Sequence, residues 1–558
     1  MSLINMIWIL FCGTLILFMQ AGFAMLETGF TRRKNAGNIA LKNLMDICIA
    51  APLFICVGFG IMFGKRNGIV GKLDIFLAKD YSAFLPEGVP LLVWVFFEMA
   101  FCATAATIVS GAMAERTRFA AYCFYSAILS TIVFPVVGHW IWGGGFLAEM
   151  GFHDFAGGTV VHTVGGVTAF AGAKILGPRI GKYSKSGKSR GIPGHNITLS
   201  VLGVMILWFG WYGFNGGSIL SGRSGSFELA GRVFINTTIA ATLSAVCAMI
   251  ISKLKYKKAD VGITVNGMLA GLVAITAGCD KVSTLGAVII GIVAGVVLVY
   301  SVEFIDKKIK VDDPVGAVSA HGVSGIAGTW MTGLLAVDDG LFYTGKVDFF
   351  CLQMLGSIIV IVSVGIFMFI VFKILDATVG LRVEPEVEIE GLDKHEHGLE
   401  MVYEDFAADE MGMETADEAG VPFVPVEEAV PVENYHLENN SLYKVEIIVK
   451  RERFLKLKEA MNQIGVTGMT VMQVLGCGMQ KGVGEYYRGT PVEMQLLPKL
   501  KVEIVLAKVP VEQVVQTARK VLYTGHIGDG KIFIYDVVDA VKIRTGAVGY
   551  DAMQGLQD

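Results

Sequence analysis

The chain has 558 residues, 53% of them apolar, and its mean hydropathy is +0.59. This composition excludes an ordinary soluble enzyme. The formal net charge is only −4, but acidic residues gather after residue 383, so we predict a membrane part followed by a soluble part.

Residues 1 to about 380 are apolar runs separated by short polar breaks. A helix needs about 20 apolar residues to cross a bilayer. The first run lacks a basic leader and a clear cleavage site, so we expect a retained span rather than a signal peptide. We predict a polytopic α-helical membrane protein with eleven transmembrane helices, near residues 5–29, 41–64, 90–113, 119–142, 155–177, 196–219, 229–250, 261–278, 283–303, 314–336 and 350–378.

The basic residues of the connecting loops predict the orientation of these spans. One set of alternate loops holds 21 Lys and Arg residues, and the other set holds 8. Loops rich in Lys and Arg stay in the cytoplasm. We therefore expect a multi-pass protein of the cytoplasmic membrane with its N-terminus outside and its soluble C-terminal part in the cytoplasm.

Neither the nine cysteines nor one glycine-containing loop predicts a metal, disulfide or phosphate-binding site. The cysteines lack the spacing of a zinc site or a disulfide framework, so packing roles are expected. The loop GKYSKSGKSRG resembles a phosphate loop, but Lys182 stands where that motif needs glycine. We therefore expect a basic loop, and neither an ATP-driven pump nor an enzyme.

Two spans carry the same pair of ionisable residues at the same spacing. Asp154 lies eight residues before His162, and Asp313 lies eight residues before His321. The two spans are five apart, and this odd separation inverts the second copy in the membrane. Inverted repeats place substrate sites near the midplane. We predict an inverted five-plus-five repeat plus one helix, with the histidines meeting near the centre.

A histidine pair inside a bilayer has a restricted chemistry. One such histidine is as readily a packing residue as a functional group, whereas two at equivalent positions favour a pathway. Two neutral imidazoles can share a hydrogen bond, and desolvation disfavours their charged form. The pair offers polar contacts and a proton relay but does not neutralise a bare ion. It therefore favours cargo that crosses as a neutral species.

Long motifs, found in order over roughly residues 1–405, point to one family. They are AGFAMLETGFTRRKNAGNIALKN, AERTRF, HWIWGGG, DFAGGTVVH, WFGWYGFNGGS and DDPVGAVSAHGVSGIAG. These motifs resemble the Amt/Mep/Rh ammonium transporters, and GLRVEPEVEIEGLDKHEHG resembles their cytoplasmic tail. The resemblance implies a homotrimer of eleven-helix subunits in the lipid bilayer, each with its own pore for ammonium or ammonia.

By this resemblance, Phe101, Trp142 and Ser218 form an outer site that recruits ammonium, and Asp154 supports that site. Aromatic faces attract a desolvated cation by about 2 kcal/mol, and a hydroxyl accepts a hydrogen bond from ammonium. Without the resemblance, the two aromatic residues would be read as packing residues and Asp154 as a helix N-cap. Glu98 departs from the family, many of whose members carry glutamine there.

The resemblance also assigns the pore. Phe101 and Phe214 match the stacked phenylalanines of its gate, and His162 and His321 match its twin histidines. We hypothesise that ammonium loses a proton, that ammonia crosses the apolar pore, and that the proton follows separately through the histidines. Potassium can bind the aromatic site but has no proton to lose.

An acidic tail and linker follow the membrane part. Residues 383–440 hold 18 Asp and Glu residues against one Lys, which is typical of a solvated tether. The tail motif argues that the first part docks under the membrane domain, which leaves 406–440 as the tether. We place the membrane domain at 1–382, the acidic tail and linker at 383–440, and a regulatory domain at 441–558.

The regulatory domain has the pattern of an α+β ferredoxin-like unit. Strand-like alternation and helical spacing succeed one another in the order βαββαβ. The motifs GMTVMQVLGCGMQKG, EYYRG, LPKLKVEIV and TGHIGDGKIFIYDVVDAVKIRTG resemble PII signal-transduction proteins over residues 441–549. The resemblance implies a trimer that senses adenine nucleotides.

Several ligand sites are implied by the PII resemblance. A glycine loop cradles phosphates with its backbone amides, although GDGK alone is equally a hairpin turn. ATP or ADP is expected, together with 2-oxoglutarate and Mg²⁺, and Met479 and Lys542 depart from the arginines that are common at these two positions. The implied nucleotide-binding residues are Gly478, Gln480, Gly528, Asp529, Gly530, Lys531, Lys542 and Arg544. The implied 2-oxoglutarate residues are Gln480, Lys481 and Lys499, with Gln480 also at the Mg²⁺.

Residues 477–497 match the mobile T-loop of PII proteins. Tyr487 and Arg488 lie at its tip, and Arg488 matches the arginine that separate PII proteins insert into an Amt pore. Val492 stands where some members carry a uridylylated tyrosine, so no such modification is expected at this position.

Ammonium transport under the control of a fused PII-like domain is the combined prediction, with no role for nucleic acid. The alternative is an ammonium sensor with little net transport, whose soluble domain signals to partners. The intact twin histidines and gate phenylalanines favour transport.

Overall fold

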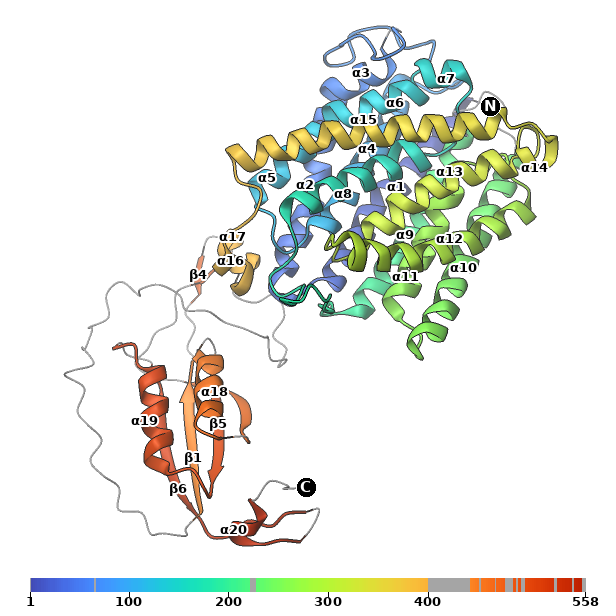
Figure 1. Ribbon diagram of the computed structural model, residues 1–558. Helices are drawn as coiled ribbons and strands as arrows, with labels where there is room; N and C mark the ends of the chain where they lie inside the picture. The colour runs from blue at the N-terminus through green and yellow to red at the C-terminus, as the bar shows by residue number, and fades with distance from the viewer. Residues whose placement is uncertain are drawn as a thin grey trace. The chain divides into compact units, whose positions relative to one another are not determined.

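Figure 1 shows the computed structural model, which describes residues 2–64, 67–220, 227–399, 442–450, 453–466, 468–476, 485–487, 490–492, 497–525, 529–543 and 546–553. The chain forms two compact units, Met1–Tyr403 and Glu404–Asp558. Each unit has its own hydrophobic core.

The first unit is built of helices. Its α-helices are α1 (Ser2–Phe30), α2 (Ala36–Leu53), α3 (Phe59–Phe63), α4 (Leu91–Met113), α5 (Phe119–Ile128), α6 (Phe134–Ile141), α7 (Phe146–Met150), α8 (Val164–Leu176), α9 (Ile197–Gly217), α10 (Phe227–Tyr256), α11 (Val261–Thr276), α12 (Thr284–Phe304), α13 (Ser324–Leu335), α14 (Leu341–Thr344), α15 (Asp348–Thr378), α16 (Pro385–Glu390) and α17 (Leu392–His397). Wider π-helical turns are η2 (Phe54–Gly58), η3 (Leu129–Val133), η4 (Gly158–Thr163), η6 (Ile305–Ile309) and η7 (Val318–Val323). Tighter 3-10 turns are η1 (Arg33–Asn35) and η5 (Ser218–Leu220).

Within the described residues, nine helical segments are long and apolar enough to cross a bilayer. The polytopic helical class is therefore observed, although the sequence predicts eleven spans. The expected spans 261–278 and 314–336 fall on α11, which has 16 residues, and on η7 with α13. The short length of α11 accounts for one of the two missing spans, and the count of eleven stays a prediction.

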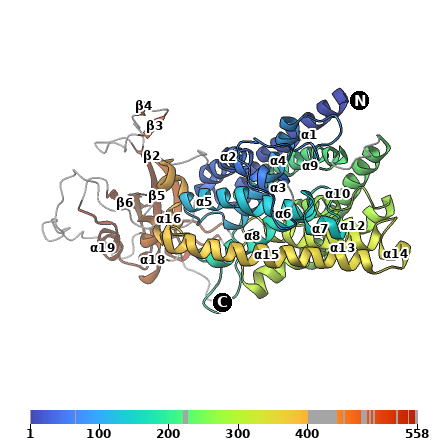
Figure 2. The ribbon, with the colours of Figure 1, turned by 90° about the horizontal axis from the view of Figure 1, so that it is seen from above.

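Glycines let α1 and α9 approach closely. A Cβ atom on Gly22 would lie 2.9 Å from the carbonyl oxygen of Gly203, and a Cβ atom on Gly203 would lie 2.5 Å from the backbone nitrogen of Leu26. Small residues at such contacts are typical of membrane helices, which gain little from hydrophobic burial in lipid. The two helices that open the predicted halves of the repeat thus lie side by side (Figure 2).

The long helix α15 lies against both α8 and α13 (Figures 1 and 2). These two helices continue directly from η4 and η7, the turns that carry the predicted histidines. One helix therefore braces both halves of the histidine region.

The segment after α15 docks on the first unit through α16 and α17. The carboxylate of Asp393 accepts hydrogen bonds from the backbone N–H groups of Gly37 and Asn38, at 2.9 and 2.7 Å, at the start of α2. Negative charge is favourable at a helix N-terminus. Gly391, with φ of +120°, allows the close approach to Lys34. The first unit thus extends past residue 382, where the sequence analysis ended the membrane domain.

The second unit contains β1 (Leu442–Val449), α18 (Phe454–Gln463), β2 (Thr470–Gly476), β3 (Glu485–Tyr487), β4 (Thr490–Val492), β5 (Leu497–Leu506), α19 (Val511–Leu522), β6 (Lys531–Val537) and α20 (Gly549–Ala552). Four strands form an antiparallel sheet in the order β2-β5-β1-β6, and β3 pairs with β4 in a separate hairpin. Apart from this hairpin and α20, the elements follow the predicted βαββαβ order.

The core of the second unit lies between the sheet and its two long helices. On β1, Val445 and Ile447 are buried and point to the same face. They join Met461 of α18 and Val514 of α19 in one apolar cluster. The opposite face of β1 is covered as well, because Glu446, between these two residues, is also buried.

Candidate functional site

Two π-helical turns bring the histidines together. His162 lies in η4 and His321 lies in η7, and both side chains are buried. Their Nδ1 atoms are 3.3 Å apart, and the rings stack with centroids 5.3 Å apart and an interplanar angle of 19°. One Nδ1 must donate and the other accept, so the pair is arranged as two imidazoles that share one proton.

Glycines four residues after each histidine permit this contact. A Cβ atom on Gly166 would collide with the backbone of Gly322, which follows His321. A Cβ atom on Gly325 would lie 2.5 Å from the carbonyl oxygen of Gly158 in η4. The matched glycines of the predicted repeat therefore serve close helix packing beside the pair.

Aromatic rings form a continuous series that ends at the pair. The Trp142 and Phe101 rings meet edge to face with centroids 5.7 Å apart, and the Phe101 and Phe214 centroids are 4.2 Å apart. Phe214 and His162 follow at 5.6 Å. Phe101 and Phe214 are fully buried, so an apolar barrier separates Trp142 from the imidazoles.

Sequence reasoning missed two rings that hold the histidines. Trp211 stacks on His162 with centroids 5.0 Å apart, and its Nε1–H donates to Thr276 Oγ1 at 2.8 Å. Phe23 lies 6.0 Å from His321, centroid to centroid. Trp211 precedes Phe214 by three residues on one helix, a spacing that signals a shared face. No comparable signal marks Phe23.

The residues of the expected recruitment site lie near the outer end of this series. Trp142 is half-buried, and its Nε1–H donates to the backbone oxygen of Asp154 at 2.7 Å. Ser218 Oγ donates to the backbone oxygen of Phe214 at 3.0 Å, and a hydroxyl oxygen can also accept hydrogen bonds. Aromatic faces and an acceptor oxygen suit a small cation that donates hydrogen bonds.

Asp154 is a capping residue that shapes this region. Its buried carboxylate accepts hydrogen bonds from the backbone N–H groups of Gly157, Thr159 and Val160, at 3.0, 2.8 and 2.9 Å. Asp313 does the same for Gly316 at 2.9 Å and for Val318 at 2.7 Å. Each aspartate fixes the loop before its histidine-bearing π turn as a capping side chain does, although the N-cap positions themselves are Gly157 and Ala317.

Another buried carboxylate in this region is Glu98, which lies on α4 three residues before Phe101. The residue is 4% exposed, and its Oε2 has no hydrogen-bond partner among the residues that the structure describes. Such a group is costly in a membrane and marks this part of α4 as chemically unusual.

A buried ion-pair cluster ties together the loops at the ends of α1, α4, α8 and η6. The Arg179 guanidinium binds Asp312 through two hydrogen bonds, at 2.8 and 2.9 Å, and lies 3.3 Å from Glu115. Arg32 Nε donates to Glu115 at 2.6 Å. Burial alone would raise the pKa of Glu115, but Arg179 and Arg32 outweigh it and hold that pKa below its ordinary value. Burial is likewise outweighed at Asp312, where Arg179 holds the pKa well below its usual range.

In the second unit, the structure describes part of the expected phosphate loop. The Asp529 carboxylate accepts hydrogen bonds from the backbone N–H of Thr524 at 2.7 Å and from its hydroxyl. Gly530 has φ of +112°, and a Cβ atom there would collide with the carbonyl oxygen of Ile448. Lys531 follows at the start of β6. A backbone that only glycine accepts thus sits directly before the predicted phosphate-binding lysine.

The remaining predicted residues of this unit are only partly visible. Lys499 lies on β5, paired with Val474 of β2, and the backbone N–H of Lys542 donates to Ala547 at 2.8 Å. Tyr487 ends β3 of the short hairpin. Outside the described residues lie Gly478, Gln480, Lys481, Arg488, Gly528 and Arg544. Among the described residues, no group of three His, Cys, Asp or Glu side chains is placed to hold a metal ion.

Two family matches divide the chain at the boundary between its units. Residues 7–403 match the Ammonium Transporter Family, and residues 442–547 match the nitrogen regulatory protein P-II family. The ammonium transporter Amt2 of Archaeoglobus fulgidus is 42% identical over 441 residues, which cover 75% of this chain and 92% of that protein. A putative ammonium transporter of Synechocystis is 41% identical, over 72% of this chain and 91% of that protein.

Solved structures show the same likeness. A structure named Sensor Amt Protein has 40% sequence identity and a TM-score of 0.67, and the match covers 71% of this chain and 98% of that chain. Mep2 of Candida albicans has 28% identity and a TM-score of 0.63, over 68% of this chain and 86% of that chain. Both resemblances stated from the sequence are thereby confirmed.

Proposed function

The chain belongs to the Ammonium Transporter Family and carries a nitrogen regulatory protein P-II domain, and from this premise we propose that it conducts ammonium under the control of that domain. The observation that carries the proposal is the unbroken series of rings from Trp142 through Phe101 and Phe214 to the histidine pair.

Recognition begins at the outer aromatic residues in this proposal. Trp142 and Phe101 attract the cation, and Ser218 accepts a hydrogen bond from it, while Asp154 holds the backbone around them. The buried phenylalanine gate is too apolar for a bare cation, because an unpaired ion pays a large desolvation cost there. Ammonium can lose that charge by giving up a proton, whereas potassium cannot.

The histidine pair then serves both products of that deprotonation. Its polar nitrogen atoms offer hydrogen bonds to neutral ammonia in an otherwise apolar passage. The Nδ1 contact between His162 and His321 also supplies a hydrogen-bonded donor and acceptor between which a proton can pass. Ammonia and the proton therefore cross separately and recombine on the cytoplasmic side.

The architecture that we propose around this pore follows the family resemblance. It has eleven spans in an inverted five-plus-five repeat plus one, in a homotrimer of the cytoplasmic membrane, with the N-terminus outside. The side-by-side position of α1 and α9 and the matched capping of η4 and η7 support the repeat. The excess of basic residues in one set of loops supports the orientation.

Regulation is assigned to residues 441–558. Gly530 and Lys531 suit the phosphates of ATP or ADP, because a strained glycine loop presents backbone amides beside a cation. We propose 2-oxoglutarate, bound with Mg²⁺, as a second effector through Lys499. Gln480, which the resemblance places at the Mg²⁺, lies outside the described residues, so no step is assigned to the metal. The T-loop tip at Tyr487 and Arg488 is the proposed pore-blocking element.

A sensor with little net transport is the second candidate, and the 40% identical structure named Sensor Amt Protein favours it. In a sensor, ammonium binding at Trp142 and Phe101 changes the second unit without flux through the histidines. Both candidates use the same outer site and differ only in whether the inner pore conducts.

Deletion of residues 441–558 tests the regulatory part. Ammonium-evoked currents of the intact and shortened chains are compared in proteoliposomes, with ATP, ADP and 2-oxoglutarate varied on the side of the second unit. We expect nucleotide to change the current of the intact chain alone. Equal currents of both chains at every nucleotide concentration would rule out self-regulation.

A further inference from the structure

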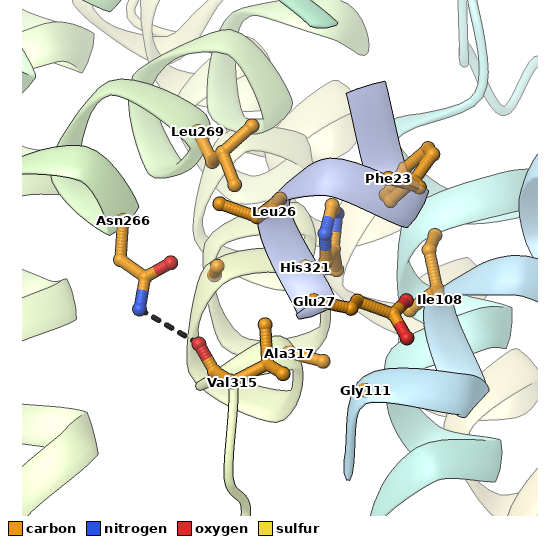
Figure 3. A pocket seen from close by; sticks show the side chains of 11 residues that line it. Phe23, Leu26, Glu27, Ile108, Gly111, Asn266, Leu269, Val315, Ala317 and His321 are labelled. Atoms are coloured by element: carbon orange, nitrogen blue, oxygen red, sulfur yellow. Dashed lines mark hydrogen bonds between the residues drawn. The ribbon is translucent and has the colours of Figure 1, made fainter. Parts of the chain in front are cut away.

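A small cavity lies directly beside His321, within the first unit. Its volume is about 10 Å³, enough for about one water molecule. Most of its lining is apolar, and the polar side chains in it belong to His321, Glu27 and Asn266 (Figure 3). Glu27 of α1 is 2% exposed, so the proposed pore has a buried carboxylate next to its inner histidine.

Asn266 gives this cavity a free acceptor. Its Nδ2 donates to the backbone oxygen of Val315 at 2.9 Å, which fixes the amide. Its Oδ1 is buried and has no hydrogen-bond partner in the part of the chain that is described. Figure 3 shows this oxygen on the side of the amide that faces the cavity. A buried water needs two to four polar partners, and Asn266, His321 and Glu27 supply three.

Glu27 lies one turn before the end of α1 at Phe30, on the side where the basic loops lie. Its Oε2 accepts a hydrogen bond from the neutral Asn43 amide at 3.1 Å. Figure 3 shows the carboxylate extending towards Ile108 and Gly111 of α4, not towards the imidazole. The link between His321 and Glu27 therefore needs a bridging molecule, and the cavity has room for one. Among the described residues, the Glu27 carboxylate forms no salt bridge. A carboxylate of this kind at membrane depth is a functional group by default.

We propose that a water molecule held in this cavity passes the proton from His321 to Glu27, which makes Glu27 the proton acceptor on the exit side of the histidine pair. The inference rests on the proposed conduction of ammonium. In the step, the imidazolium of His321 gives its proton to the water, and the water gives another proton to the carboxylate. Glu27 becomes a neutral carboxylic acid and later releases the proton to the cytoplasm, which restores the carboxylate.

The test uses the full chain in proteoliposomes, with two readouts. Ammonium-evoked current on a supported membrane reports the proton, and alkalinisation of a lumenal pH dye reports entry of neutral ammonia. Glu27→Gln keeps an acceptor oxygen for Asn43 but does not titrate. We expect it to lower the current at least about tenfold and to leave ammonia entry within about twofold of wild type.

Three further variants make the result specific. Glu27→Asp keeps a titratable carboxylate and should retain part of the current. Glu228→Gln changes an exposed glutamate at the start of α10 and should behave as wild type. If Glu27→Gln does not purify as a folded protein, Asn266→Leu removes the water's acceptor and should give the same loss of current with Glu27 in place.

The outcomes separate this inference from the proposed function. A wild-type current that Glu27→Gln and Asn266→Leu both leave unchanged would overturn the role of Glu27 alone. A parallel loss of current and ammonia entry would assign Glu27 a structural role and also overturn the inference. A wild-type chain with neither ammonium-evoked current nor lumenal alkalinisation would overturn the conduction proposal and this inference together.

Discussion

His162 Nδ1 lies 3.3 Å from His321 Nδ1, although 159 residues separate them in the chain. Two π turns, each preceded by a capping aspartate and followed by a glycine contact, produce this geometry. The remaining nitrogen of His162, Nε2, is buried without a partner among the described residues. The pair is thus a polar contact inside an apolar passage. Burial of these nitrogen atoms has a desolvation cost, which indicates a functional role.

Replacement of either histidine should break the coupling of proton and ammonia. In His162→Ala and His321→Ala, the Nδ1 contact is lost and the proton has no adjacent acceptor. We expect the proton-coupled current to fall at least about a hundredfold. Supported-membrane currents with ammonium and with potassium measure both coupling and selectivity, and unchanged values of both would refute the relay.

Removal of the gate ring should admit water. Phe214→Ala takes away the ring that lies between Phe101 and His162. A wider, wetter passage lowers the desolvation cost of a cation, so potassium should begin to pass. Potassium flux into proteoliposomes is the measurement, and Tyr212→Phe on the same helix is the control. A potassium-tight Phe214→Ala would show that the barrier lies elsewhere.

Asp154 should matter for stability more than for charge. Its carboxylate accepts three backbone N–H groups, and Asp154→Ala leaves them buried and unpaired. We expect a loss of about 3 kcal/mol or more in the free energy of unfolding. Asp154→Asn keeps an acceptor oxygen and should lose less. Thermal unfolding in detergent compares the two, and equal midpoints for wild type and Asp154→Ala would contradict the capping role.

The fold class could be predicted from the long apolar runs in the sequence. The histidine pair could be predicted from the repeated spacing between aspartate and histidine. The residues that complete the site could not. Phe23 contacts His321 from a helix distant in sequence, and Glu27 of the same helix lines the cavity beside His321. Neither position has a sequence signal for this placement. The docking of Asp393 on α2 joins residues more than 350 positions apart. The predicted domain boundary at residue 382 was placed where the apolar sequence ends. Packing of the following segment extends the first unit to Tyr403.

The Arg179 cluster should make the first unit sensitive to acid but only at low pH. The pKa values of Glu115 and Asp312 are lower in the folded protein than the ordinary carboxyl values. Their contribution is therefore complete above the unfolded pKa values, about 4, and is lost as the pH falls through the folded ones.

Arg179→Met should raise the pH at which the first unit begins to lose stability. Loss of the guanidinium leaves two buried carboxylates short of a partner and should cost about 3–5 kcal/mol. Thermal midpoints between pH 7 and pH 4 measure both effects. The exposed Arg118–Glu384 pair offers a matched control in Arg118→Met, which should cost less than about 1 kcal/mol. Equal losses for the two variants would contradict the role of burial.

Gly530→Ala should disable the nucleotide loop. The substitution places a Cβ atom against the carbonyl oxygen of Ile448 at a φ of +112°. The loop must move, which shifts Asp529 and Lys531 away from their positions. We expect ADP affinity to fall at least about tenfold by calorimetry on the full chain, an effect of about 1.4 kcal/mol. Gly468→Ala, where a Cβ atom meets open space, should bind as wild type.

The most direct test of the account is the current that an ammonium jump evokes from the intact chain on a supported membrane. Tryptophan fluorescence on the same preparation reports whether ammonium binds near Trp142. The account predicts a current that scales with ammonium, is absent with potassium at the same concentration, and disappears in His321→Ala. Ammonium binding with neither current nor ammonia entry would contradict conduction and favour the sensor.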